Sequence, residues 1–284
     1  FVLDKFGYCK ILEPSIYERN RETVDTENVY VLPCHTTDKI GLFTDLGAFH
    51  QVKVTEIPFG KLRDKGVPID NLSKFDGTKE RPVCVVNVAQ LKGQKLLFAT
   101  KDAMIKIVPG GEFETNNRTV AATKLQENDM LLSVQPADGM KEAVIQTTSG
   151  IFLRFPIEEI SEMKKNAKGV RGIKLRDGDY VVGVGVCRPG ATVLTVTEDG
   201  KGRRSLIDDY RITKRGGLGI RNYTRGGVAG IKIVDDTDDL ILISQDGILI
   251  RMHANDINVQ SRYGSGVRVM RLIGEDKVAV LARV

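Results

Sequence analysis

The sequence predicts an all-β fold of short strands, and three observations support that prediction. Val and Ile are frequent, while amphipathic stretches with a 3.6-residue period are nearly absent and the helical candidates are short, such as residues 157–164. Gly accounts for 29 of 284 residues, as many tight turns require. Six times the chain also repeats one pattern: an apolar run, a turn, and an apolar strand that carries Lys or Arg.

The six copies follow one another along the chain. Their turn positions are Gly7, Gly47, Ala103, Gly150, Gly200 and Gly247, at spacings of 40, 56, 47, 50 and 47 residues. About 20 residues after the later turns comes a second landmark, usually a Gly followed by apolar and basic residues in alternation, as in 168–184. Repeats of this length built from short strands are typical of propeller-like rings of blades, which usually serve as binding surfaces.

We therefore expect residues 1–284 to form one domain, a closed ring of six antiparallel four-stranded blades. The expected repeats are 1–35, 36–90, 91–139, 140–187, 188–236 and 237–284. We expect the last strand, near 278–284, to close the ring beside the first repeat, because an open edge would invite aggregation. The chain begins directly in a strand pattern, so we expect it to be part of a longer protein.

The placement of basic residues is more informative than the mild net charge of +5. Basic side chains recur three or four residues after the turns, at Lys10, Lys106, Arg154, Arg203, Arg204 and Arg251, while the second repeat has His50 with Lys53 beyond it. Equivalent positions in a ring lie at equivalent radius and height. The pattern therefore predicts a belt of positive charge that a bent polyanion would follow.

A second basic series lies in the loops that join the two halves of each repeat. It comprises Lys61, Arg63, Lys65, Lys164, Lys165, Lys168, Arg171, Lys214, Arg215, Arg221, Arg262 and Arg268. Neighbouring glycines, as in 214–219, would let the backbone approach a phosphate. Any single loop is equally well interpreted as a tight connection kept soluble by its charge. The recurrence over four loops favours DNA.

Residues for catalysis or metal binding are scarce. His35, His50 and His253 are isolated, and no HExxH or GxSxG sequence occurs. The four cysteines form no CxxC pair, which disfavours a zinc site and fits buried thiols in a reducing cytosol. No apolar run is long enough to span a membrane. Trp is absent and aromatics make up only 6%, which favours contact with duplex backbone over stacking on single strands.

Three runs carry a family resemblance: residues 169–184 (GVRGIKLRDGDYVVGV), 198–210 (EDGKGRRSLIDDY) and the tail 247–284. They resemble the C-terminal domain of bacterial type IIA topoisomerase A subunits, the family of the gyrase A and topoisomerase IV A subunits. The resemblance implies a six-bladed β-pinwheel in which each blade lends a strand to its neighbour and duplex DNA wraps around the basic rim. It also implies an accessory domain, with the active-site tyrosine outside this chain.

The family implies further partners. These are duplex DNA, the N-terminal catalytic part of the same polypeptide, and an ATPase B subunit in an A2B2 heterotetramer, in the bacterial cytoplasm at the nucleoid. No cofactor is expected in this domain, since ATP and Mg would bind elsewhere in the enzyme, and no metal site or membrane contact is expected.

One stretch departs from the gyrase pattern. Gyrase A subunits carry a Gln-Arg-Arg-Gly-Gly-(Arg/Lys)-Gly box shortly after the first blade turn, which the family links to DNA wrapping and negative supercoiling. Residues 17–24 stand there and keep Arg19 and Arg21 but lack the double Gly, while Glu22 adds a repelling charge. This favours a relaxing or decatenating enzyme of the topoisomerase IV kind. A gyrase with a degenerate box and a propeller that binds protein partners remain alternatives. A propeller enzyme would need inner carboxylates or histidines, and none is evident.

Overall fold

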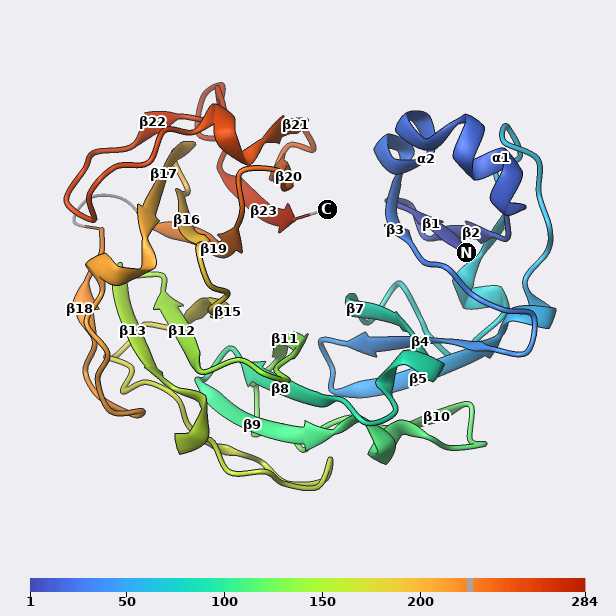
Figure 1. Cartoon of the computed structure of the whole chain (residues 1–284), viewed down its shortest axis with the longest axis horizontal. Helices are drawn as coiled ribbons and strands as arrows, with labels where there is room; N and C mark the ends of the chain where they lie inside the picture. The colour runs from blue at the N-terminus through green and yellow to red at the C-terminus, as the bar shows by residue number, and fades with distance from the viewer. Residues whose placement is uncertain (224–226, 284) are drawn as a thin grey trace. The chain divides into compact units, whose positions relative to one another are not determined.

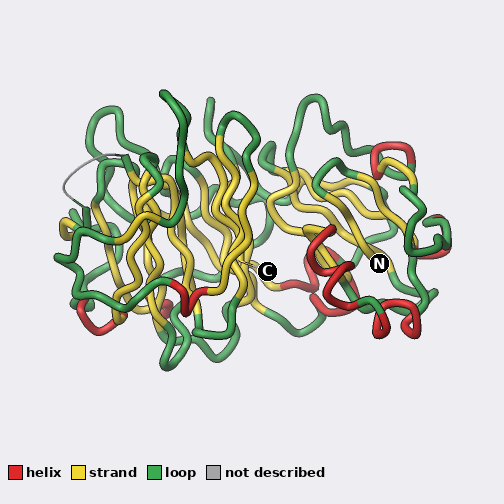
Figure 2. The backbone as a smooth tube through the Cα atoms, turned by 90° about the horizontal axis from the view of Figure 1, so that it is seen from above, coloured by secondary structure: helices red, strands yellow, loops and turns green. Residues whose placement is uncertain are grey.

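Strands and connecting loops make up most of the chain, as Figure 2 shows. The computed structural model describes residues 1–223 and 227–283. Its contacts divide the chain into two compact units. The first comprises Phe1–Leu96, Val108–Val134 and Met163–Lys168, and the second comprises Leu97–Ile107, Gln135–Glu162 and Gly169–Val284. The interpretation of residues 1–284 as one domain of six repeats stays a prediction.

The described strands form six antiparallel sheets. The sheets succeed one another along the chain, which the change of colour from blue to red traces in Figure 1. The first sheet has the order β3 (Asn28–Val31), β1 (Val2–Asp4), β2 (Tyr8–Lys10), β6 (Val67–Pro68). The second has the order β10 (Thr119–Ala121), β5 (Ala48–Lys53), β4 (Lys39–Thr44), β7 (Pro82–Asn87). The third has the order β11 (Leu131–Pro136), β8 (Lys95–Thr100), β9 (Met104–Pro109), β14 (Val170–Arg171).

The last three sheets repeat the same plan with one exception. The fourth has the order β15 (Val181–Val186), β12 (Glu142–Thr147), β13 (Ile151–Pro156), β18 (Ile220–Arg221). The fifth has the order β19 (Val228–Val234), β16 (Thr192–Thr197), β17 (Lys201–Leu206), β22 (Val267–Arg268). The sixth has three strands among the described residues, in the order β21 (Leu249–His253), β20 (Asp239–Ser244), β23 (Val278–Arg283).

Each repeat contributes a central hairpin, and the expected turns are where the sequence placed them. The turn residue has a positive φ in all six, which glycine adopts without steric cost. The third turn uses Ala103 at φ 65°, one of the two non-glycine residues with positive φ in the described chain. The hairpins make an all-β fold of successive antiparallel sheets, as the sequence predicted. The last sheet departs from the expected four strands, because among the described residues no strand pairs beyond β21.

Strand exchange between consecutive repeats explains the sheet orders. Each of the first five sheets has two edge strands. The edge strand that pairs with the second strand of the hairpin is a segment of two or three residues from the following repeat. The last strand of the chain, β23, pairs with β20 of its own sheet, through pairs such as Leu242 with Leu281. The expectation that this strand closes the ring beside the first repeat stays a prediction. The edge left without a partner strand in the described chain therefore belongs to β21.

The helices are short and few. The 3-10 turns are Val54–Glu56, Ile69–Asn71, Val88–Leu91, Gly110–Phe113, Ile157–Glu159, Ile207–Asp209 and Ala254–Asp256. The helical candidate at 157–164 forms only the turn Ile157–Glu159. Two α-helices, α1 (Pro14–Arg19) and α2 (Arg21–Glu27), were not predicted. Pro14 at the start of α1 is a recognised helix-initiating position, so the signal was present in the sequence.

Each unit has its own apolar core. In the first unit, Ile40, Leu42 and Ile69 are fully buried together, and α2 adds Val24 to a smaller cluster with Val2. In the second unit, Leu194, Leu240 and Leu242 belong to one cluster, and Phe152 packs on Tyr210 in another with ring centroids 4.1 Å apart. Burial of apolar side chains stabilises each hairpin, which would be marginal alone.

Candidate nucleic-acid interface

Lys10 was expected on an exposed belt but is 8% exposed at the end of β2. Its Nζ donates hydrogen bonds to the carbonyl oxygens of Lys61, Leu62 and Asp64, at 3.0, 2.8 and 2.5 Å. An ammonium group has three N–H donors, and the backbone takes all three here. Lys10 therefore fixes the loop that carries Lys61 and Arg63 and has no donor left for a phosphate.

Arg154 has the corresponding role in the fourth sheet. Its Nη1 donates to the carbonyl oxygens of Ile207 and Tyr210 at 2.7 and 3.0 Å, while Nε donates to the Glu142 carboxylate at 2.6 Å. Desolvation opposes the charge of Arg154, but the bonds to Glu142 and Asp208 outweigh it and raise its pKa. The guanidinium is charged and is neutralised within the protein.

Arg203 and Arg204 continue this pattern in the fifth sheet. Arg203 is 2% exposed and donates to the carbonyl oxygens of Gly264 and Asn222 at 2.8 and 3.1 Å. Arg204 is 4% exposed and pairs with Asp236 at 2.5 Å. Both side chains hold segments of the second unit in place.

The expected belt of exposed charge is therefore absent at most of these positions. The buried ones are Lys10, Lys106, Arg154, Arg203 and Arg204. Arg251 is half-buried and pairs with Asp239, while Lys53 is exposed. Sequence periodicity could not tell a basic side chain that faces solvent from one that binds backbone carbonyls, because both recur with the repeat.

The second basic series is mostly exposed. In the first unit the exposed members are Lys61, Arg63, Lys65, Lys164 and Lys168. In the second unit they are Arg171, Lys214, Arg221 and Arg268. Arg215 and Arg262 are half-buried and staple the loops: Arg215 donates to the carbonyl of Arg171 at 2.6 Å, and Arg262 to that of Arg221 at 3.2 Å. Lys165 likewise donates to the carbonyl of Glu112 at 2.8 Å.

Three of the four loop segments contain no acidic residue. Residues 163–176 contain six Lys or Arg and no Asp or Glu, residues 211–221 contain four and none, and residues 258–272 contain three and none. In residues 57–68 the single acid, Asp64, accepts a hydrogen bond from the Lys61 backbone amide at 2.7 Å. Each segment thus presents positive charge to solvent, as a phosphate-binding surface requires.

A third basic series was missed at the sequence level. Lys124, Lys174 and Arg271 are exposed, and each lies three residues after the short strand that completes the preceding sheet. The position is recognisable only once the exchanged strand is known. It adds one exposed charge in each of these three repeats.

The glycines of the loops serve the strand exchange. A Cβ on Gly219 would come within 2.7 Å of the Phe152 carbonyl oxygen, and one on Gly169 within 2.6 Å of that of Ile105. Both residues have positive φ. Close approach of two protein strands therefore accounts for these glycines, and approach to a phosphate is not needed to explain them.

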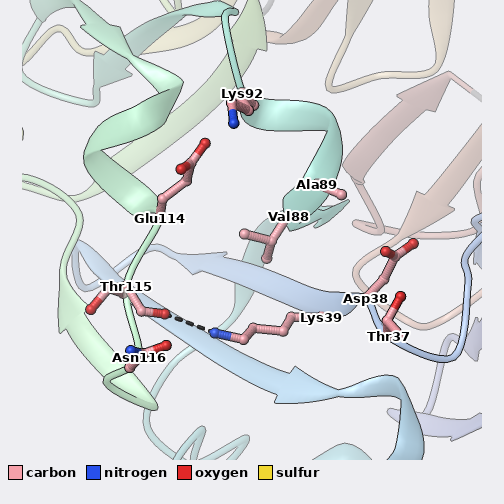
Figure 3. A pocket seen from close by; sticks show the side chains of 9 residues that line it. All are labelled: Thr37, Asp38, Lys39, Val88, Ala89, Lys92, Glu114, Thr115 and Asn116. Carbon is pink, nitrogen blue, oxygen red and sulfur yellow. Dashed lines mark hydrogen bonds between the residues drawn. The ribbon is translucent and has the colours of Figure 1, made fainter.

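One cavity of the first unit holds charged side chains that the protein itself binds. It has a volume of about 460 Å³ in the first unit and is lined by residues such as Lys39, Asp38, Lys92 and Glu114 (Figure 3). Lys39 donates to the Thr115 carbonyl oxygen at 2.9 Å, and Asp38 accepts from the backbone amide of His35 and from Asn87. The charged groups that carry these bonds are held by the protein itself.

The cysteine thiols and the potential metal ligands of the described residues show no arrangement for reaction or metal binding. Burial raises the pKa of the Cys9 and Cys84 thiols to about 12, so both stay protonated at neutral pH. No three His, Cys, Asp or Glu side chains of the described chain are grouped as metal ligands. None of its described helices has the length and apolar character that crossing a membrane needs.

The segment in the position of the gyrase box is helical. Residues 17–24 span the end of α1 and the start of α2. Arg19 and Arg21 are both exposed; Arg19 Nε donates to the Ser15 carbonyl oxygen at 3.0 Å, and Arg21 lies 3.6 Å from the Asp25 carboxylate. In the later repeats the corresponding part of the chain is a loop with a short strand.

A family model described as "DNA gyrase C-terminal domain, beta-propeller" matches residues 94–138, 141–188, 191–235, 219–241 and 238–284. The chain belongs to this family. The resemblance to the C-terminal domains of type IIA topoisomerase A subunits is thereby confirmed, and so is the interpretation as a non-catalytic domain of such a protein.

Relatives and solved structures agree with this family. The A subunit of DNA gyrase from Staphylococcus aureus strains MRSA252 and NCTC 8325 is 33% identical over 258 residues, which is 88% of this chain and 29% of each relative. The chain thus spans under a third of their length. The C-terminal domain of a DNA topoisomerase IV has the same fold, with a TM-score of 0.89 and 22% identity over 100% of this chain and 92% of that one. A DNA gyrase A C-terminal domain matches 90% of this chain and 85% of its own length with a TM-score of 0.72 and 22% identity.

Proposed function

We propose that this domain binds and bends duplex DNA without sequence preference and presents it to the catalytic core of an ATP-dependent type IIA topoisomerase. The supporting observation is the recurrence of exposed basic loops that lack acidic residues, at 163–176, 211–221 and 258–272. Phosphate contacts of this kind position a duplex and carry no base information.

Salt dependence tests the binding surface. Exchange of Lys214 and Arg221 for Gln should lower the slope of log K against log salt by roughly 0.9 for each phosphate that is no longer neutralised. The control is the double exchange of Lys141 and Lys277, which are also exposed in the second unit but lie outside the acid-free loops, with Lys277 paired to Glu198. Equal slopes for the two double variants would show that the loops are only a solvated surface.

The wider assembly belongs to the same proposal. The DNA-bound domain would act with the N-terminal catalytic part of its own polypeptide and with an ATPase B subunit in an A2B2 heterotetramer, at the bacterial nucleoid. We propose that ATP and Mg are used outside this domain and that it takes no cofactor itself.

We further propose a relaxing and decatenating enzyme of the topoisomerase IV kind. Residues 17–24 fold as helix and lack the double Gly, which supports weak chiral wrapping at the first repeat. Bending a short duplex costs on the order of 1–6 kcal/mol, so a shorter contact path favours partial bending. Efficient ATP-dependent negative supercoiling of relaxed plasmid by the full-length protein with its ATPase partner would instead assign it to the gyrase class.

A further inference from the structure

Five sheets are completed by a short strand from the following repeat, always in one register. The second residue after the hairpin turn pairs with Val or Ile of that strand, and the first residue after the turn pairs with the next position. The pairs at the second residue are Cys9–Val67, Phe49–Val120, Ile105–Val170, Phe152–Ile220 and Gly202–Val267.

A backbone hydrogen bond accompanies each pairing. The carbonyl oxygen of the turn residue accepts from the amide that follows the short strand. The bonds run to Gly7 from Ile69, to Gly47 from Ala122, to Ala103 from Gly172, to Gly150 from Asn222 and to Gly200 from Val269, at 2.9, 2.8, 2.7, 2.8 and 2.9 Å. The same register and the same backbone hydrogen bond thus occur in five sheets, and they define the kind of strand that this edge of a sheet binds.

The sixth sheet has the same hairpin but no such strand in the described part of the chain. Leu249 occupies the position of Cys9 and Phe152, yet it is 38% exposed where those two are fully buried. Its neighbour Ile248 is 39% exposed. The apolar side chains that the other sheets cover are thus open to solvent at β21.

The backbone at Leu249 is aimed outward. Ser244 donates its amide hydrogen to the Ile248 carbonyl oxygen at 2.9 Å, so that carbonyl faces β20. The N–H of Leu249 shares its peptide plane with this carbonyl and points the opposite way. It faces the side on which the other five sheets bind their exchanged strand.

The first repeat carries no short strand that could take this role. Between its second strand and β3 the described chain forms α1 and α2, whereas each later repeat has an exchanged strand in that place. No such strand is therefore built into the first repeat.

We propose that the outer edge of β21 binds an extended segment of a partner polypeptide with the sequence Gly, then Val or Ile, then Arg. Three of the five internal occupants, at 169–171, 219–221 and 266–268, read Gly-Val-Arg or Gly-Ile-Arg. Main-chain hydrogen bonds to Leu249 and to the Gly247 carbonyl supply affinity, and the covered Ile248 and Leu249 side chains select a β-branched residue. Occupation also protects an edge that invites aggregation.

The test uses a fluorescent peptide with the sequence of residues 167–175, Ala-Lys-Gly-Val-Arg-Gly-Ile-Lys-Leu. We expect saturable binding by fluorescence polarisation, no binding of a scrambled peptide of equal charge, and slower amide exchange at Leu249 in the complex. Leu249→Pro removes the outward N–H without removing a bond to β20, and should weaken binding at least tenfold. Leu249→Arg is a second variant that keeps the strand.

Val280→Arg is the matched control, because Val280 is 45% exposed on β23 at the opposite edge of the same sheet. It should bind the peptide as the unaltered chain does. Equal affinity for the peptide and its scrambled version, or unchanged affinity in both Leu249 variants, overturns the proposal. A dimer of the chain that Leu249→Pro dissociates would also overturn it, since the occupant would then be a second copy.

Discussion

Arg154 donates a hydrogen bond from Nη1 to the carbonyl oxygen of Tyr210 at 3.0 Å, and so ties the fourth sheet to a turn of the following repeat. The same guanidinium binds the Glu142 carboxylate at 2.6 Å. A basic residue that recurs with the repeat thus acts inside the protein. Stability and DNA affinity should therefore respond to different arginines.

Arg154→Met should lower the free energy of unfolding by about 1–3 kcal/mol, because it leaves the partly buried Glu142 carboxylate and two carbonyl oxygens without their donor. Arg221→Met, at an exposed position, should change it by less than about 0.5 kcal/mol. Urea unfolding measures both. A stable Arg154→Met with a reduced salt slope for DNA would instead place Arg154 in contact with phosphate.

Gly200→Ala and Gly247→Ala should differ although their φ angles, 81° and 86°, are alike. Both pay about 1–2 kcal/mol for a left-handed residue with a side chain. A Cβ at Gly200 would in addition lie 2.4 Å from the Met270 carbonyl oxygen, whereas one at Gly247 meets nothing within 4 Å. Thermal unfolding should show the larger loss for Gly200→Ala. Equal losses would mean that the exchanged strand shifts without cost.

Lys174 and Arg271, which sequence periodicity missed, should contribute to DNA affinity. Their joint exchange for Gln removes two exposed charges and should reduce the salt slope by roughly 0.9 for each phosphate left unpaired, with no change in preference among duplex sequences. Titration at several salt concentrations measures this. A change in sequence preference would show that these side chains read bases.

Asp239 should make the last sheet sensitive to acid. Burial opposes its charge, but hydrogen bonds from Arg251 and His253 outweigh it and hold the pKa below the usual value. A depressed folded-state pKa means that the stabilisation is present above the unfolded value, about 3.9, and is lost as the pH falls through the folded value. Asp239→Asn should therefore be less stable than the parent at pH 7, with the gap narrowing below about pH 4. A gap independent of pH would assign the effect to packing.

The repeats were predictable because two signals coincide in them: a turn residue with positive φ and alternation of apolar residues. The turn at Ala103 was predicted correctly although Ala stands where the other repeats have Gly, because the apolar residues on both sides follow the same pattern as in the other repeats. Which basic residues face solvent was not predictable. Lys10 and Lys61 look alike in sequence. Only the path of the exchanged loop shows that the Lys10 ammonium group binds the Lys61 carbonyl oxygen while the Lys61 side chain faces solvent.

The helices α1 and α2 were not predicted, because the resemblance at residues 17–24 concerns only the missing double Gly. The signal for a helix lies earlier, in Pro14 at the first helical position of the run that ends at Glu27. The resemblance implied strand exchange between neighbouring repeats, but it did not show which sheet has no exchanged strand, so the three-stranded form of the last sheet could not be deduced.

Exchange of strands also sets an order of events during synthesis. Strand β2 ends at Lys10, but its outer partner β6 begins only at Val67. Because a ribosome adds about 5–20 residues per second, the outer edge of β2 stays without its partner strand for seconds. A hairpin forms in about 1–10 μs. Each hairpin is therefore complete long before its sheet is. A chain interrupted after any of the first five hairpins exposes one unpaired strand edge to solvent, so the site at risk of aggregation changes as the chain grows.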